Sequence, residues 1–454
     1  MGRTAKTGHI IETAITDLAF DGRSVGEING KIIFFNGGLP GEIVRAEIIR
    51  RKARYAFARV IEIINKSPDR IKAPCIHFDI CGGCAWQDLE YSKQLYFKRK
   101  QISDCLRHIG RIDGIEIAET VASPRQYYYR NKMEFSLNGS TQDFVLGLHQ
   151  RGHFDQIFDV KECLLQSSRS NQIADWFRAF VSQNGIPVYN ISKHIGFIRF
   201  LAIREVCHTG QIMLNIVTTE GEIPHRRTMI EEGIARFPQI STILQNVNSS
   251  KSNIARGEKE QILYGAGFIE EKILDYAFRI YANSFFQTNS LQAEKLYQLI
   301  LEMLQPQKND CLLDLYCGTG TIGICAAKSV AKVVGIESEP SAILAARENA
   351  LANGIGNIFF QTGLVEDILA EKTDAFPEFT AVIVDPPRAG MHPRALKKLV
   401  ELGCPKMVYV SCNPATFARD ASCLMQSGYK IGRIIPVDMF PHTMHIELVA
   451  NLYK

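Results

Sequence analysis

Several segments near the C-terminus end in side chains that can do chemistry. The segment MVYVSCNP, residues 407–414, runs four apolar residues into a serine, the thiol of Cys412 and an Asn-Pro pair. Such a thiol can be a nucleophile, a metal ligand or a small core residue. The apolar segment AVIVDPP presents the carboxylate of Asp385, and the later segment PHTMHIE ends in Glu447. Each residue taken singly has an inert interpretation, but a thiol beside a carboxylate favours a nucleophile with its base.

These residues belong to a part of the chain in which strands and helices alternate from Leu291 onward. Apolar strands that alternate with helices predict a doubly wound, Rossmann-like parallel sheet covered by helices on both faces. Ligands of such sheets bind at the carboxyl ends of the strands. We expect the last strand to run antiparallel beside the strand that ends at Cys412, so that Cys412, Glu447 and Asp385 face one pocket. The strands are predicted at residues 311–317, 332–339, 357–363, 381–387, 407–412, 434–440 and 445–454.

A glycine-rich turn follows the first of these strands. Gly318, Gly320 and Gly323 satisfy the spacing G-x-G-x-x-G between a strand and a helix. Glycines let the backbone approach a ligand at a helix N-terminus. Glu337 ends the next strand, where its carboxylate can accept hydrogen bonds from both hydroxyls of a ribose. The pattern therefore indicates a cofactor that contains adenosine, and a nicotinamide cofactor fits it as well as any other.

The N-terminal residues 1–66 have a different pattern. Five short strands with glycine-containing turns between them predict a small closed β-barrel of OB type. Such barrels often bind oligonucleotides, although a barrel can also serve only as a spacer. Basic residues gather in the last two strands and beyond, which indicates either an RNA-binding face or a solvated basic face. They are Arg45, Arg50, Arg51, Lys52, Arg54, Arg59, Lys66, Arg70, Lys72, Lys93, Lys98, Arg99 and Lys100.

A cysteine-rich loop opens the middle of the chain. Residues 67–280 mix strand-like and helical segments and predict an α+β domain with an antiparallel sheet, which leaves residues 281–454 as the third domain. Cys75, Cys81 and Cys84 have the spacing C-x5-C-x2-C. Three thiols within ten residues indicate a metal centre when the compartment is reducing. Their spacing does not distinguish zinc from an iron–sulfur cluster.

Length and composition are those of an ordinary globular protein with several domains. The chain has 454 residues, too many for one core, with 46% hydrophobic and 22% charged residues. Its start, MGRTAKTGHI, lacks the apolar core of a signal peptide, and no apolar run approaches the ~18 residues that cross a membrane. We therefore expect a cytoplasmic protein. The net charge of +4 is weak evidence for a polyanionic partner.

Taken together, the motifs of the C-terminal half resemble those of the RNA uracil-5-methyltransferase family. They occur in the order that this family has, whereas RNA cytosine-5 enzymes carry a proline–cysteine pair at the position of Asp385. The N-terminal barrel resembles the TRAM domain, and barrel, cysteine loop and catalytic half together resemble the branch that modifies 23S ribosomal RNA. The motifs are SFFQTN (284–289), DLYCGTG (314–320), GIE (335–337), DPPRAG (385–390), YVSCNP (409–414) and PHTMHIE (441–447).

The resemblance implies a role for each candidate residue. Cys412 would be the nucleophile, and Glu447 the base that removes the proton from carbon 5 of uracil. The cysteine loop would hold a [4Fe–4S] cluster whose fourth ligand is Cys163, in the segment DVKECLL. Thr321 stands where some relatives have Asn, so we assign it no role. The S-adenosylmethionine site would be lined by Gln287, Tyr316, Gly318, Glu337 and Asp385.

The resemblance also implies an RNA substrate, a uridine of 23S rRNA. The base must leave its stack to reach a pocket, so a single-stranded or loop segment is expected. Transfer RNA remains an alternative because both branches share these catalytic residues. An RNA-binding or RNA-folding module without turnover is another alternative, and a nicotinamide-dependent dehydrogenase rests on the glycine pattern alone. We expect no membrane association and no obligatory protein partner.

Overall fold

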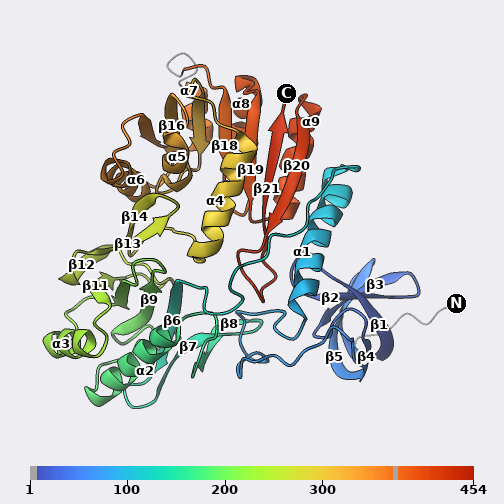
Figure 1. Ribbon diagram of the computed structural model, residues 1–454. Helices are drawn as coiled ribbons and strands as arrows, with labels where there is room; N and C mark the ends of the chain where they lie inside the picture. Colours follow the sequence, from blue (N-terminus) through green and yellow to red (C-terminus); the bar gives the residue numbers. More distant parts are fainter. Residues whose placement is uncertain (1–7, 372–376) are drawn as a thin grey trace.

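The computed structural model describes residues 8–371 and 377–454. Figure 1 shows three parts built on β-sheets: a barrel in blue, a central sheet in green, and a sheet drawn in orange and red at the C-terminal end. None of the helices in the described residues is long and apolar enough to cross a membrane.

The barrel is formed by five strands in the order β1-β2-β3-β5-β4. Alternate side chains of the strands point inward, so Ile33, Phe35, Ala56 and Ala58 are buried in the barrel core. The predicted OB-like barrel is confirmed. The strands are β1 (Ile10–Leu18), β2 (Ser24–Ile28), β3 (Lys31–Asn36), β4 (Ile43–Arg51) and β5 (Tyr55–Asn65).

A helix connects the barrel and the cysteine loop to the rest of the chain. Helix α1 (Tyr91–Cys105) continues into a short π-helix, Leu106–Gly110, which ends at Arg111 in the left-handed conformation. Buried residues of α1 such as Ile102 pack in the same cluster as helix α9 of the C-terminal sheet. Helix α1 therefore lies against the C-terminal sheet, as Figure 1 also shows.

The central sheet has seven strands in the order β12-β11-β10-β9-β6-β7-β8. The prediction of a wholly antiparallel sheet is wrong for one pair, because β10 and β11 run parallel. Helix α3 (Arg226–Arg236) connects these two strands, and a helical crossover allows parallel pairing. Helix α2 (Ser168–Gln183) packs Phe177 and other apolar side chains in the core of this part. The strands are β6 (Lys132–Gly139), β7 (Phe144–Gln150), β8 (His153–Asp159), β9 (Ile198–Glu205), β10 (Ile212–Thr218), β11 (Ile240–Val247) and β12 (Lys259–Gly265).

A two-stranded sheet, β13 (Phe268–Ile273) and β14 (Tyr276–Tyr281), leads into the C-terminal sheet. That sheet has the order β17-β16-β15-β18-β19-β21-β20, and the predicted doubly wound architecture is confirmed. Its strands are β15 (Cys311–Leu315), β16 (Lys332–Glu337), β17 (Ile358–Thr362), β18 (Ala381–Val384), β19 (Lys406–Ser411), β20 (Lys430–Val437) and β21 (Glu447–Tyr453). Its helices are α4 (Ser290–Leu304), α5 (Thr321–Ala327), α6 (Pro340–Ala352), α7 (Val365–Glu371), α8 (Pro393–Leu402) and α9 (Pro414–Gln426).

Both faces of this sheet are covered. Neighbouring residues of one strand, such as Leu312 and Leu313, belong to different apolar clusters on opposite faces. Helices α4, α5 and α6 contribute to one cluster, and α7, α8 and α9 to the other. This double burial explains why the strands read as continuous apolar runs in the sequence.

The last strand is the one that reverses direction. Strand β21 pairs antiparallel with β19, and Ser411 lies opposite Leu448. The same register, continued by one residue, sets Cys412 opposite Glu447. The expected antiparallel insertion beside β19 is therefore confirmed.

The glycine turn generates a testable difference between two of its residues. Gly320 has φ +75°, and a Cβ there would lie 2.8 Å from Cζ of Phe360, while Gly318 has φ +54° and open space around it. Gly320→Ala should therefore lower the free energy of unfolding by ~3 kcal/mol, through both backbone strain and overlap. Gly318→Ala should lower it by only about 1 kcal/mol, through strain alone. Urea unfolding followed by circular dichroism compares the two, and equal losses would contradict the packing argument.

Candidate active site

The predicted catalytic and cofactor residues line a single cavity of about 870 Å³. It lies at the carboxyl ends of β15, β16, β18 and β19, where ligands of doubly wound sheets bind. Its volume is that of a site for a small molecule. The residues that the sequence predicted, and that the cavity brings together, are Gln287, Tyr316, Gly318, Glu337, Asp385, Cys412 and Glu447.

The glycine turn and the end of β16 form one corner of this cavity. The backbone N–H of Gly318 donates to Oε2 of Glu337 at 3.2 Å, and the N–H of Glu339 donates to Oε1 at 2.9 Å. The Ser338 hydroxyl also donates to Oε1, at 3.0 Å. These bonds hold the carboxylate of Glu337 beside the turn before any ligand binds, in the place where a ribose would be recognised.

Burial raises the pKa of two carboxyls beneath the cavity. Asp385 has its pKa raised to about 7 by burial. Asp314, on β15, has its pKa raised to about 8, first by burial and then by the charges of Asp385 and Glu337, although the N–H of Gly323 donates to its Oδ2 at 3.0 Å. The sequence analysis gave Asp314 no role, and only its place in the motif DLYCGTG marked it. A cation in the cavity would relieve this concentration of negative charge.

Cys412 and Glu447 form the reactive edge of the cavity. Burial, followed by the charges of Glu447 and Asp385, raises the pKa of the Cys412 thiol to about 12. Burial and the charge of Asp385 also raise the pKa of Glu447 well above its ordinary value. The guanidinium of Arg388 opposes both shifts. The two groups therefore compete for negative charge, so that a proton on one favours the ionised form of the other.

Arg388 joins the loops that carry these groups. Its carbonyl oxygen accepts a hydrogen bond of 2.8 Å from Nδ2 of Asn413, the residue after Cys412. One guanidinium nitrogen lies 3.5 Å from Nδ1 of His445. The sequence analysis assigned no role to Arg388, although the motif DPPRAG contains it. Its contacts connect the ends of β18 and β19 with the segment before β21.

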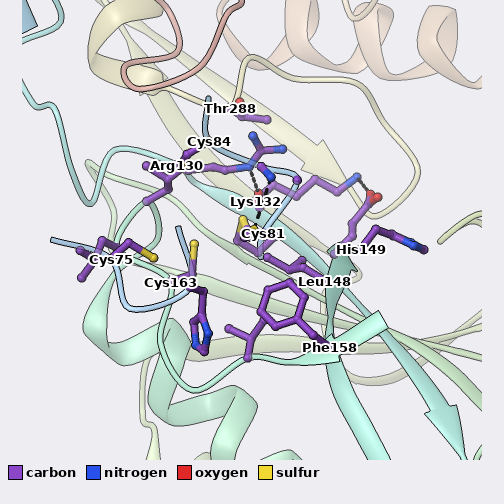
Figure 2. A pocket seen from close by; sticks show the side chains of 18 of the residues that line it. Cys75, Cys81, Cys84, Arg130, Lys132, Leu148, His149, Phe158, Cys163 and Thr288 are labelled. Atoms are coloured by element: carbon purple, nitrogen blue, oxygen red, sulfur yellow. Dashed lines mark hydrogen bonds and ion pairs between the residues drawn. The ribbon is translucent and has the colours of Figure 1, made fainter. Parts of the chain in front are cut away.

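A second cavity, of about 920 Å³, contains all four predicted metal ligands, Cys75, Cys81, Cys84 and Cys163. Figure 2 shows the labelled cysteine side chains around one part of this cavity. The N–H of Gly83 donates to the sulfur of Cys81 at 3.3 Å, and Nε2 of Gln87 donates to that of Cys84 at 3.2 Å.

The thiols influence one another strongly. Burial, and then the charges of Cys163, Cys81 and Cys75, raise the pKa of Cys84 to about 12, with the Gln87 hydrogen bond acting in the opposite direction. Burial and the neighbouring Cys81 and Cys75 raise the pKa of Cys163 as well. No group of three or more His, Cys, Asp or Glu within residues 8–371 and 377–454 is arranged to hold a metal ion. The four sulfurs are thus neighbours without being gathered around a single point.

The two cavities adjoin each other. Ser284, Phe285 and Phe286 line both of them, and the side chain of Phe285 is largely exposed. The cysteine cavity also contains Arg130 and Lys132, which Figure 2 shows close together. A polymer lying across this wall would contact both cavities at once.

Comparison with known proteins identifies the family. Residues 90–454 match the tRNA (Uracil-5-)-methyltransferase family, and residues 5–61 match the TRAM domain. The chain belongs to the tRNA (uracil-5-)-methyltransferase family. The resemblance inferred from the motifs is confirmed.

Similar proteins cover nearly the whole chain. An uncharacterised RNA methyltransferase of Halalkalibacterium halodurans is 36% identical over 98% of this chain and 96% of its own length. Another, of Chlorobaculum tepidum, is 38% identical over the same shares. Among solved structures, the tRNA (uracil-54, C5)-methyltransferase of Pyrococcus abyssi in complex with S-adenosyl-L-homocysteine is 34% identical, with a TM-score of 0.78. That match covers 97% of this chain and 99% of that one. The similarity therefore extends over all three parts of the chain.

Several basic residues of this family member have partners that the sequence analysis did not foresee. Lys98, counted there with an exposed basic face, is fully buried and lies 2.6 Å from a carboxylate oxygen of Asp438. Arg70 is bound to the buried Glu42 and to Asp88. A helix with a mixed surface gives no sign of which lysine points inward, so sequence counting overstated the basic face.

Proposed function

We propose that this protein transfers a methyl group from S-adenosylmethionine to carbon 5 of a uridine in RNA. The observation that carries the proposal is the position of Cys412 opposite Glu447, at the edge of a cavity that also contains Asp385 and Glu337. Membership of the uracil-5-methyltransferase family supports the same reaction. An RNA-binding module without turnover would need neither the thiol nor the buried base.

The cavity suits S-adenosylmethionine as the cofactor. Glu337 would accept the ribose hydroxyls, with Gly318 beside it, while Gln287, Tyr316 and Asp385 line the remaining wall. Burial raises the pKa of Asp385, so a cation beside it would stabilise the carboxylate, and the sulfonium is a cation. Bound S-adenosylmethionine supplies the electrophilic methyl group. A nicotinamide cofactor would leave Cys412 without a purpose, and the similar Pyrococcus abyssi enzyme binds S-adenosyl-L-homocysteine.

The Cys412 thiol makes carbon 5 of uracil a stronger nucleophile. Carbon 5 of uracil is too weak a nucleophile to accept a methyl group unaided. The Cys412 sulfur adds to carbon 6, and the electron pair of the 5,6 double bond moves into the ring as an enolate. Carbon 5 is then electron-rich and takes the methyl group, and the electrons of the broken methyl–sulfur bond stay with S-adenosylhomocysteine. Before the addition the thiol must lose its proton to water, and Arg388 is placed to stabilise the thiolate.

The carboxylate completes the reaction. Glu447 takes the proton from carbon 5, the electrons of that C–H bond form the 5,6 double bond again, and the bond between carbon 6 and sulfur breaks to release the thiolate. A fully buried carboxyl with a raised pKa is an effective base at neutral pH once it is ionised. Cys412 thereby activates carbon 5 for methylation, and Glu447 allows the methylated base to leave the enzyme.

RNA binding is assigned to the barrel, residues 1–66, and the chemistry to residues 281–454, with residues 67–280 between them. We propose 23S rRNA as the substrate, because barrel, cysteine loop and catalytic motifs together resemble that branch. Transfer RNA is the second candidate, since the similar Pyrococcus abyssi enzyme methylates uracil 54 of tRNA. In either RNA the target base must swing out of its stack to reach Cys412.

We further propose that Cys75, Cys81, Cys84 and Cys163 hold a [4Fe–4S] cluster. Four thiols line one cavity, two of them receive hydrogen bonds, and apolar Phe78 and Leu165 pack around them. The cluster, when bound, would tie the loop to the central domain, and no step of the methylation needs its electrons.

Cys412→Ala should abolish turnover. With RNA tritiated at uracil carbon 5, tritium release should fall by about a thousandfold or more. Without the thiol the enolate cannot form, so carbon 5 is not methylated and keeps its tritium. Cys423→Ala, at an exposed cysteine, is the matched control and should keep full release. The assay is run on 23S rRNA and tRNA transcripts in parallel, and the RNA that is methylated identifies the substrate. Release that survives Cys412→Ala, or the absence of methyl transfer by the wild type on both RNAs, would contradict the proposal.

Cys163→Ser should remove the cluster. Purified anaerobically, this variant should lose most of its iron and the visible absorbance of the cluster, because one of four ligands is gone. Cys207→Ser, at an exposed cysteine outside the cavity, should keep both. Unchanged iron content in Cys163→Ser would show that the fourth ligand lies elsewhere.

A further inference from the structure

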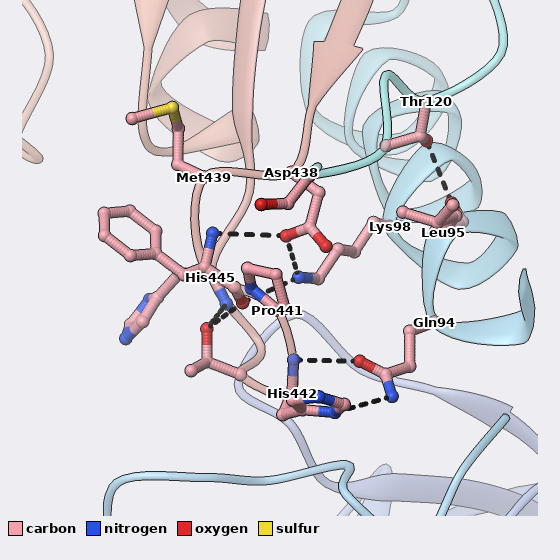
Figure 3. A network of polar contacts seen from close by, with 12 residues as sticks. Gln94, Leu95, Lys98, Thr120, Asp438, Met439, Pro441, His442 and His445 are labelled. Atoms are coloured by element: carbon pink, nitrogen blue, oxygen red, sulfur yellow. Dashed lines mark hydrogen bonds and ion pairs between the residues drawn. The ribbon is translucent and has the colours of Figure 1, made fainter. Parts of the chain in front are cut away.

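The segment that delivers Glu447 to the active site is held by a buried polar network. We call residues 438–446, between β20 and β21, the arm. Figure 3 shows the arm meeting helix α1 through Lys98, Gln94, Asp438 and His442. These contacts join residues more than 300 positions apart in the chain.

The first part of the arm is anchored by an ion pair. Nζ of Lys98 donates to Oδ1 of Asp438 at 2.6 Å and to the carbonyl oxygen of Phe440 at 3.1 Å. Oδ2 of Asp438 accepts a hydrogen bond of 2.9 Å from the hydroxyl of Tyr91. Both charged side chains are fully buried. A buried pair adds little net stability compared with apolar residues, but it fixes geometry closely because every group needs its partner.

The second part of the arm is anchored by the side-chain amide of Gln94. The N–H of His442 donates to Oε1 of Gln94 at 2.9 Å, and Nε2 of Gln94 lies 3.2 Å from Nδ1 of His442. His442 is in the left-handed region, with φ +66°, an unfavourable conformation for a residue with a Cβ. Such strain persists only where the surroundings impose it, and here helix α1 does so.

The arm also contacts the cysteine loop and the barrel, which lie outside the catalytic sheet. The carbonyl oxygen of His442 accepts hydrogen bonds from the N–H groups of Ala85 and Trp86, at 2.9 and 3.0 Å, directly after Cys84. The ring of Tyr127 stacks on His442 at 4.3 Å. Met444 packs against the turn of the barrel at Gly22. The cysteine loop, helix α1 and the barrel therefore all converge on the segment that precedes Glu447.

We propose that Lys98, Asp438 and Gln94 are positioning residues that set where the carboxylate of Glu447 stands. The proposal rests on the function proposed above, and goes beyond it by separating the two halves of the reaction. Cys412 directly follows β19, and among the described residues no hydrogen bond or ion pair of Lys98, Asp438 or Gln94 reaches it. The arm meets that side of the site through the 3.5 Å contact of His445 with Arg388. Glu447, by contrast, is joined to the arm directly, as the first residue after it. Loosening the arm therefore slows proton removal from carbon 5 more than it slows addition of the thiol to carbon 6.

This asymmetry predicts an accumulating intermediate. When thiol addition and methylation proceed but proton removal is slow, the bond between sulfur and carbon 6 persists and the methylated RNA stays attached to the protein. Lys98→Met removes the ion pair with a side chain of similar length. Gln94→Met removes the two contacts with His442 and also the hydrogen bonds from Nε2 to the carbonyl oxygens of Trp86 and Leu89. It leaves no unpaired charge, so it provides a second variant where Lys98→Met folds poorly.

The experiment mixes enzyme, S-adenosylmethionine and unmodified RNA, and measures turnover together with the fraction of protein crosslinked to RNA on a denaturing gel. We expect Lys98→Met and Gln94→Met to lower kcat by about tenfold or more. A loss of this size lies within the rate enhancement that a general base contributes. The crosslinked fraction should rise toward that of Glu447→Gln, and the isotope effect of 5-deuterated uridine on kcat should increase. Ser92→Ala, at an exposed position of the same helix, should behave as the wild type.

Two results would overturn the proposal while leaving the function intact. Either the variants lose turnover and crosslink in equal proportion, as a merely destabilised protein would, or they keep the kcat and isotope effect of the wild type. A wild type without methyl transfer, and a Glu447→Gln variant without a crosslink, would instead overturn the proposed function. The wild-type and Glu447→Gln measurements therefore distinguish failure of this proposal from failure of the proposed function.

Discussion

The antiparallel insertion of β21 between β19 and β20 is the constraint on which the proposed chemistry depends. A parallel strand would have delivered its first residue to the opposite edge of the sheet, far from every ligand-binding strand end. Because β21 runs the other way, its first residue, Glu447, lies opposite Cys412 at the end of β19. Two side chains 35 positions apart thereby share one cavity, and the register of a single strand pair sets their relation.

Several buried carboxyl groups lie near one another at this edge of the sheet. Burial raises the pKa of Asp314, Asp385 and Glu447, and the charge of Asp385 raises the pKa of the other two further. Carboxyl groups this close together oppose one another's ionisation, so a cation beside them is favourable. Burial also raises the pKa of the Cys412 thiol, so the proposed nucleophile is favoured in its protonated form. In the proposed reaction, cofactor binding and thiol ionisation would therefore both depend on this arrangement of charges.

Features with a local cause could be predicted from the sequence. The barrel strands follow from glycine-containing turns and alternation, and the C-terminal sheet from apolar runs between helices. Cys412, Asp385 and Glu447 followed because strand ends of a doubly wound sheet meet at one edge. Gln287 and Tyr316 followed only from the resemblance to the family. What could not be predicted depends on distant contacts: the parallel pairing of β10 with β11, and the burial of Lys98 against Asp438, 340 positions away. Nothing in the neighbourhood of Lys98 distinguishes it from the exposed lysines of the same helix, so charge counting placed it on the surface.

The central claim is that the Cys412 sulfur bonds to carbon 6 of the target uracil. RNA carrying 5-fluorouridine tests it most directly, because the fluorine that replaces the carbon 5 hydrogen cannot be removed as a proton and the adduct persists. After incubation with S-adenosylmethionine and digestion by protease and nuclease, mass spectrometry should find a methylated fluorouridine on the peptide that contains Cys412. An adduct on another residue, or no adduct from an enzyme that methylates unmodified RNA, would contradict the account.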